Sequence, residues 1–99
     1  MKKTYTFDNQ NGTFISFLDY EEEDDFEAFL AFVSDKLGVP VPEARLSPYS
    51  VFTELSYSGS ILTAACGSDA GCYLRIPPES QLSADEIVEK CYGIATQGQ

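Results

Sequence analysis

Two glycine-containing turns in the second half of the chain constrain its fold more than any other feature. The turn at residues 58–59 pairs Leu55 with Leu62, and the next turn pairs Cys66 with Cys72. Because a slip of one residue at either turn would mix the two faces of the strands, the agreement between the turns predicts a three-stranded antiparallel meander. Its buried face is expected to carry Val51, Leu55, Leu62, Ala64, Cys66, Cys72, Leu74 and Ile76.

The opposite face of this meander is the first candidate binding surface. Its strands should align in two rows, which contain Glu54, Thr63 and Arg75 and then Phe52, Ala65 and Tyr73. One interpretation is an ordinary solvated face with an ion pair between Glu54 and Arg75. The other is a contact patch for a protein, because aromatic residues and arginine are enriched at interfaces. The partner-binding candidates here are Phe52, Glu54, Tyr73 and Arg75.

Residues 3–20 predict a β-hairpin. With Asn11 and Gly12 at the centre of its turn, Phe7 lies opposite Ser16. Tyr5, Phe7, Phe14 and Leu18 then share one face, and Ile15 and Phe17 share the other. Because the second strand is apolar on both faces, it is either an interior strand or a strand with one face used for contact.

Two amphipathic segments predict helices. The first repeats apolar residues at helical spacing, has Asp24 or Asp25 as its cap, and ends at Gly38. Its buried stripe is Phe26, Phe29, Leu30, Val33 and Leu37. The second begins with the capping box of Ser83 and Glu86 and ends before Gly93. It should bury Ile87, Val88 and Cys91, with Tyr92 at the edge.

These segments follow one another in the order ββαβββα, with residues 39–48 as a connecting loop. The chain of 99 residues is long enough for one domain, residues 1–99, and its apolar content of 43% argues against disorder. We therefore expect an α+β fold in which a mostly antiparallel five-stranded sheet has two helices packed on one face.

The residues before the first helix are unusually acidic. Seven carboxylates fall within nine residues, and we call them the acidic run: Asp19, Glu21, Glu22, Glu23, Asp24, Asp25 and Glu27. One or two acids satisfy a helix cap and the helix dipole. One interpretation is an ordinary solvated helix start. The other is functional: the carboxylates that the cap and dipole do not need bind a cationic partner.

The overall charge restricts the partners. With a net charge of −10 and no histidine, the chain is unsuited to nucleic acid or anionic membranes, and a basic protein is favoured. The sequence has no membrane-spanning run and no signal peptide, so we expect a cytoplasmic protein. Its three cysteines should then stay reduced and serve as small buried hydrophobes, although Cys66 and Cys72 face each other across a hairpin.

No motif indicates catalysis. Residues 67–71 are glycine-rich but lack the lysine of a phosphate-binding loop, and the acidic run lacks the pattern of a calcium loop. Without histidine, neither a general base nor a zinc site is evident. We expect no enzyme activity, no cofactor and no metal.

Three functional hypotheses follow. Size and charge resemble those of toxin-neutralising immunity proteins, so the first is an inhibitor that covers the cationic cleft of a toxin or nuclease. It would be a monomer or weak dimer with the acidic run in the contact. The second is a homodimeric secretion-type chaperone or adaptor that presents Phe52, Ile61 and Tyr73 to a client. The third, a small-molecule enzyme or sensor, requires a deep polar pocket that no spacing here predicts.

Overall fold

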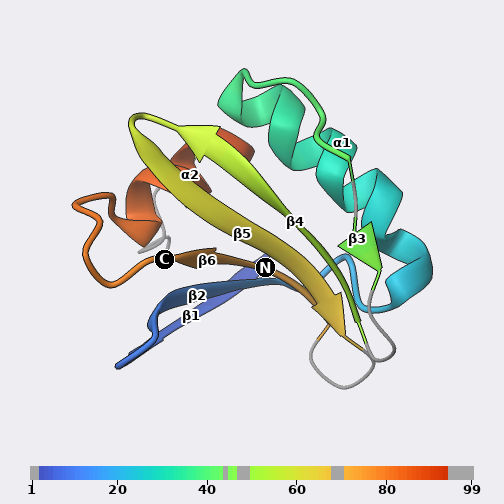
Figure 1. Ribbon diagram of the computed structural model, residues 1–99, viewed down its shortest axis with the longest axis horizontal. Helices are drawn as coiled ribbons and strands as arrows, with labels where there is room; N and C mark the ends of the chain where they lie inside the picture. The colour runs from blue at the N-terminus through green and yellow to red at the C-terminus, as the bar shows by residue number, and fades with distance from the viewer. Residues whose placement is uncertain (1–2, 44, 47–49, 68–70, 94–99) are drawn as a thin grey trace.

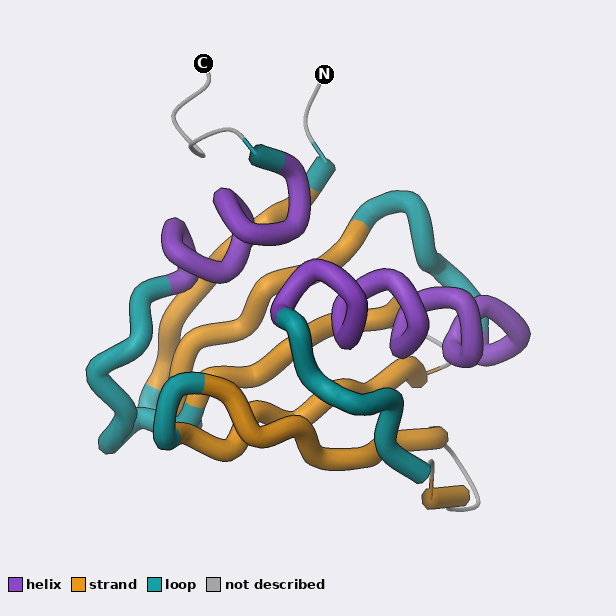
Figure 2. The backbone as a smooth tube through the Cα atoms, turned by 90° about the horizontal axis from the view of Figure 1, so that it is seen from above, coloured by secondary structure: helices purple, strands orange, loops and turns teal. Residues whose placement is uncertain are grey.

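A computed structural model describes residues 3–43, 45–46, 50–67 and 71–93 of the chain. The predicted α+β fold is confirmed: one antiparallel sheet carries both helices on the same side (Figures 1 and 2). The strands lie in the order β1-β2-β6-β5-β4-β3. The elements are β1 (Thr4–Asn9), β2 (Gly12–Phe17), the 3-10 turn η1 (Glu23–Asp25), α1 (Phe26–Leu37), β3 (Arg45–Leu46), β4 (Ser50–Tyr57), β5 (Ser60–Gly67), β6 (Gly71–Ile76) and α2 (Ala84–Tyr92).

The meander β4-β5-β6 has the predicted register. Leu55 lies opposite Leu62, and Cys66 lies opposite Cys72. Ser58 and Gly59 both have positive φ, 54° and 82°, which is the backbone that a two-residue hairpin turn requires. All eight residues expected on the covered face are at most 7% exposed. The five predicted strands are present, and the two-residue strand β3 joins the β4 edge inside the segment expected to be a loop.

The predicted register of the first hairpin is wrong by two residues. Gln10 and Asn11 form the turn, and Phe7 pairs with Phe14 instead of Ser16. Gly12 (φ 126°) lies in β2 and not in the turn. Only glycine fits at this position, because a Cβ atom on residue 12 would lie 2.2 Å from the carbonyl oxygen of Ile76. Since the shift is an even number of residues, the predicted faces survive it.

β2 is an interior strand, as one of the two interpretations required. It pairs with β1 on one side and with β6 on the other. Ile15 and Phe17 point toward the helices and are 0% and 1% exposed. The β1–β2 hairpin and the β4-β5-β6 meander therefore form one continuous sheet.

The two helices cover the sheet largely as expected. The predicted stripes of α1 and α2 are buried, and Gly38 and Gly93 end the helices with φ of 73°. The hydroxyl of Ser83 accepts a hydrogen bond from the backbone N–H of Glu86 at 3.2 Å, as a capping residue does. Asp25, one of the two expected caps of α1, occupies the N-cap position, but its side chain makes no hydrogen bond to the helix.

Aromatic rings fill the space where α1 and α2 meet β2. The ring of Phe17 packs edge-on against Phe29 at 5.1 Å and lies 6.3 Å from Tyr92. Burial raises the pKa of the Cys91 thiol to about 11 and that of Tyr92 to about 12. The hydroxyls of Ser34 and Tyr92 are buried here without a hydrogen-bond partner in the described part of the chain.

Candidate functional site

The face of the sheet turned away from the helices, here called the open face, carries a continuous line of aromatic side chains. Ring centroids are 6.0 Å apart for Tyr5 and Phe7, 5.1 Å for the stacked pair Phe7 and Phe14, and 5.7 Å for Phe14 and Tyr73. We call these four residues the aromatic row. They come from β1, β2 and β6, and Tyr73 joins the row because β2 pairs with β6.

The two rows predicted across the meander are confirmed and continue into the hairpin. Thr63 lies between Glu54 and Arg75, and Ala65 between Phe52 and Tyr73. On β2, Phe14 is opposite Arg75, and Ser16 is opposite Tyr73. The four sheet residues expected to bind a partner are therefore on one surface.

Arg75 does not form the ion pair expected for a plain solvated face. Its Nε donates a hydrogen bond of 2.8 Å to the carbonyl oxygen of Asn11 in the β1–β2 turn. Within the described residues no ion pair joins Arg75 to Glu54, which is exposed. Arg75 thus holds the first hairpin against β6.

The open face leaves unusually large apolar groups in solvent. Tyr5 is 53% exposed, Phe7 40% and Ile61 52%, whereas Phe52 and Tyr73 are half-buried. An exposed apolar patch bordered by polar residues is typical of a protein contact surface.

The sequence did not identify three members of this surface, Tyr5, Phe7 and Phe14, as site residues. It placed them together on one face and showed that β2 is apolar on both sides. The missing information was the partner of β2, because β2 and β6 are separated by more than fifty residues and no turn joins them.

The acidic run lies where β6 begins, and the structure divides its members. The Nζ of Lys3 pairs with Asp19 at 3.1 Å, and Asp25 is half-buried and accepts two backbone hydrogen bonds. Glu21, Glu22, Asp24 and Glu27 are exposed. The side chain of Glu23 lies outside the part of the structure that is described. At least four carboxylates therefore face solvent at one end of the sheet.

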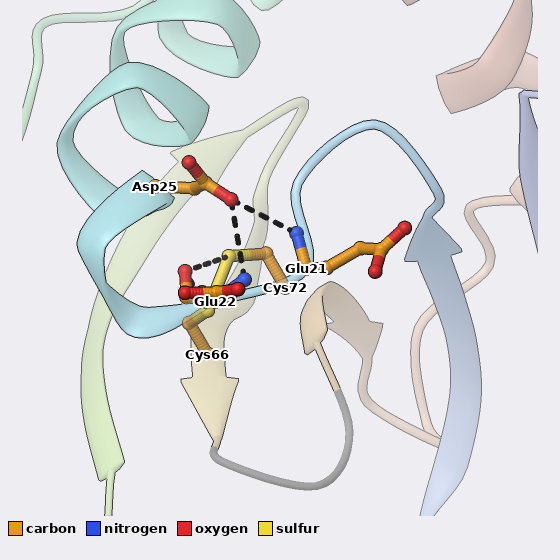
Figure 3. The surroundings of a disulfide bond; sticks show 5 residues. All are labelled: Glu21, Glu22, Asp25, Cys66 and Cys72. Atoms are coloured by element: carbon orange, nitrogen blue, oxygen red, sulfur yellow. Dashed lines mark hydrogen bonds between the residues drawn. A yellow bond between two sulfur atoms is a disulfide. The ribbon is translucent and has the colours of Figure 1, made fainter.

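The cysteines depart from the expectation that all three stay reduced. Cys66 and Cys72 form a disulfide between directly opposed positions of β5 and β6 (Figure 3). Cys91 is a free, buried thiol. The pairing follows from the predicted register, but the oxidised state was not expected. All three side chains are buried, as predicted.

Backbone contacts bring the acidic run onto this disulfide. The N–H of Cys72 donates to the carbonyl oxygen of Tyr20 at 2.9 Å. The carbonyl oxygen of Glu22 lies 3.0 Å from Sγ of Cys66 and 3.7 Å from Sγ of Cys72. Burial, followed by the charges of Asp19 and Asp25, raises the pKa of Tyr20 at this junction.

Three further observations concern other kinds of site. Neither helix in the described residues has the length and apolarity needed to cross a bilayer. In the same part of the chain, no group of three or more cysteine, aspartate or glutamate side chains is arranged to hold a metal ion. Comparison of the chain with protein-family models, curated proteins and solved structures gave no match.

Proposed function

We propose that this chain is a small cytoplasmic protein-binding module that inhibits a basic partner, in the manner of an immunity protein that neutralises a toxin or nuclease. It acts by binding and not by catalysis. The observation that carries the proposal is the open face, where exposed aromatic side chains lie in a protein of net charge −10.

The two surfaces divide the work of binding. The aromatic row supplies large, rigid side chains whose burial provides most of the affinity, as aromatic anchors do at protein interfaces. The exposed acids at the end of the sheet attract a cationic partner and raise its association rate. Arg75 and Glu54 give the centre of the face polar groups that fix the orientation of the partner.

The experiment compares two sets of variants for binding to the proteins that the wild-type chain captures from a lysate of the native host. Phe7→Ser with Phe14→Ser removes the stacked pair, and Glu21→Gln, Glu22→Gln and Asp24→Asn neutralise three exposed acids. The first set should raise the dissociation rate and the second should lower the association rate and its salt dependence. Asp35→Asn with Glu79→Gln and Glu89→Gln, which neutralises three exposed acids outside the acidic run, is the matched control for charge.

If the captured partner is acidic, or if its binding is insensitive to salt and to both variant sets, the chain is not an inhibitor of a basic protein. If the variant with Phe7→Ser and Phe14→Ser binds the partner as tightly as the wild type, the open face is not part of the contact.

A second function, a homodimeric chaperone or adaptor, is favoured by the same exposed face. Two copies packed through their aromatic rows would bury Phe7 and Ile61, which are 40% and 52% exposed. Because each copy carries −10, added salt should strengthen such a dimer, whereas it weakens binding to a basic partner. Molar mass measured by light scattering at low and high salt separates the two functions.

A further inference from the structure

The disulfide between Cys66 and Cys72 lies beneath the backbone of residues 20–22. Tyr20 accepts a hydrogen bond from the N–H of Cys72, and the carbonyl oxygen of Glu22 touches both sulfurs. Cys66 is 0% exposed and Cys72 is 1% exposed. Because a thiolate must reach one sulfur to open a disulfide, this backbone has to move before the bond can be exchanged.

One carboxylate holds the covering backbone in place. Oδ2 of Asp25 accepts hydrogen bonds from the N–H of Glu21 at 3.1 Å and of Glu22 at 3.2 Å. The N–H of Asp25 in turn donates to the carbonyl oxygen of Glu22 at 2.9 Å. Figure 3 shows the Asp25 carboxylate bonded to the backbone nitrogens of Glu21 and Glu22, beside the two cysteines. The covering segment is therefore fastened by Asp25 and not by helix capping.

The fold also suits the reduced form of the pair. Cys66 and Cys72 are six residues apart and directly opposed in the β5–β6 ladder, so the pairing of the two strands keeps these positions opposite each other without the covalent bond. A disulfide that closes so short a loop constrains the unfolded chain less than a long-range one does. After reduction, the carbonyl oxygen of Glu22 is in position to accept a hydrogen bond from either thiol.

We propose that Cys66 and Cys72 are a reversible redox pair whose exchange with external thiols is gated by the segment 20–25. An external thiolate bonds to one cysteine sulfur, and the other cysteine leaves as a thiolate that takes a proton from water. The second thiolate of the reductant then attacks the reductant's sulfur in the mixed disulfide. The remaining cysteine leaves as a thiolate and also takes a proton from water. The reductant leaves as a disulfide, and both cysteines become thiols. This inference does not depend on the proposed binding function.

The test measures how fast dithiothreitol reduces the disulfide of the folded, oxidised protein. Thiols are trapped by alkylation at timed intervals, and the modified cysteines are identified by peptide mass spectrometry. Asp25→Ala should accelerate reduction roughly tenfold or more, because it removes two hydrogen bonds to a charged acceptor. Asp25→Asn keeps an acceptor oxygen and should restore most of the protection.

The matched control is Asp24→Ala, which removes the same charge from an exposed neighbour and should reduce at the wild-type rate. Equal rates for wild type and Asp25→Ala, or equal acceleration by Asp24→Ala, would overturn the gate. Should Asp25→Ala fail to fold, the wild-type protein alone decides the matter. Its disulfide must be reduced more slowly in buffer than in denaturant, and oxidised dithiothreitol must re-form it in the folded state. Loss of either behaviour would also overturn the proposal.

Discussion

Both faces of the sheet carry aromatic side chains, but only one face is buried. Strand β2 shows the difference with Phe14 and Phe17, which are three positions apart. Phe17 points toward the helices, is 1% exposed and contacts Phe29. Phe14 points the other way, stacks on Phe7 and stays partly in solvent. What separates the faces is the pair of helices that covers only one of them, and not their apolar content. A strand that is apolar on both faces therefore indicates a core on one side and a contact surface on the other.

Phe17 and Phe14 should contribute unequally to stability, because only Phe17 lies under the helices. We expect Phe17→Ala to lower the free energy of unfolding by about 3–5 kcal/mol, because it leaves a cavity between β2 and α1. Phe14→Ala should lower it by about 1 kcal/mol, since only a partly exposed cross-strand contact is lost. Urea unfolding of both variants measures the difference.

The separation of the faces also depends on the register of β2 against β6, which Gly12 permits. Gly12→Ala should destabilise the protein by about 2–3 kcal/mol, because its Cβ would overlap the Ile76 carbonyl and its φ is positive. Gly67→Ala, where a Cβ meets nothing within 4 Å, is the control and should change the stability little. Similar losses at both glycines would show that close packing at Gly12 does not hold the register.

Helix α2, which covers part of the buried face, begins with a capping hydrogen bond whose contribution to stability can be measured. Ser83→Ala removes the acceptor for the Glu86 N–H and should lower the free energy of unfolding by about 1 kcal/mol. Ser56→Ala, at an exposed position of β4, should have almost no effect. An unchanged midpoint for Ser83→Ala in urea would mean that packing alone fixes this helix.

The smallest expected effect is an alkaline loss of stability that arises only on the covered face. Burial raises the pKa of Cys91 from 9.0 to about 11 and that of Tyr92 from 10.0 to about 12. The folded state then holds more protons than the unfolded state, so this contribution is complete below pH 9 and is lost as the pH rises toward 12. In urea titrations between pH 8 and 11, the double variant Cys91→Ala and Tyr92→Phe should lose less stability with pH than the wild type. An identical slope would contradict the assignment.

Much of the fold follows from short-range rules, and the rest does not. The turn at Ser58 and Gly59 and the cap at Ser83 are set by neighbours in sequence, so local chemistry predicts them. The first hairpin was misplaced by two residues because Gly12 serves a contact with Ile76, far along the chain. The same reason hid the aromatic row, which depends on the pairing of β2 with β6.

The candidate site was predicted in its residues more than in its arrangement. The sequence identified the acids and the meander residues of the open face. It did not show that Asp25 would turn back to the N–H groups of Glu21 and Glu22, or that their backbone would cover a disulfide. Those contacts depend on how residues 20–25 pack against the β5–β6 hairpin, which is distant in sequence. No periodic pattern in the sequence predicts such packing.

The unpartnered hydroxyls of Ser34 and Tyr92 have a practical consequence. Neither has a hydrogen-bond partner among the described residues, and a buried hydroxyl without one contributes less to stability than a bonded hydroxyl does. Removal of such a hydroxyl is therefore expected to cost the fold little. Protein engineers who need to vary the core of a scaffold that presents the aromatic row should begin at Ser34, far from that row, with alanine.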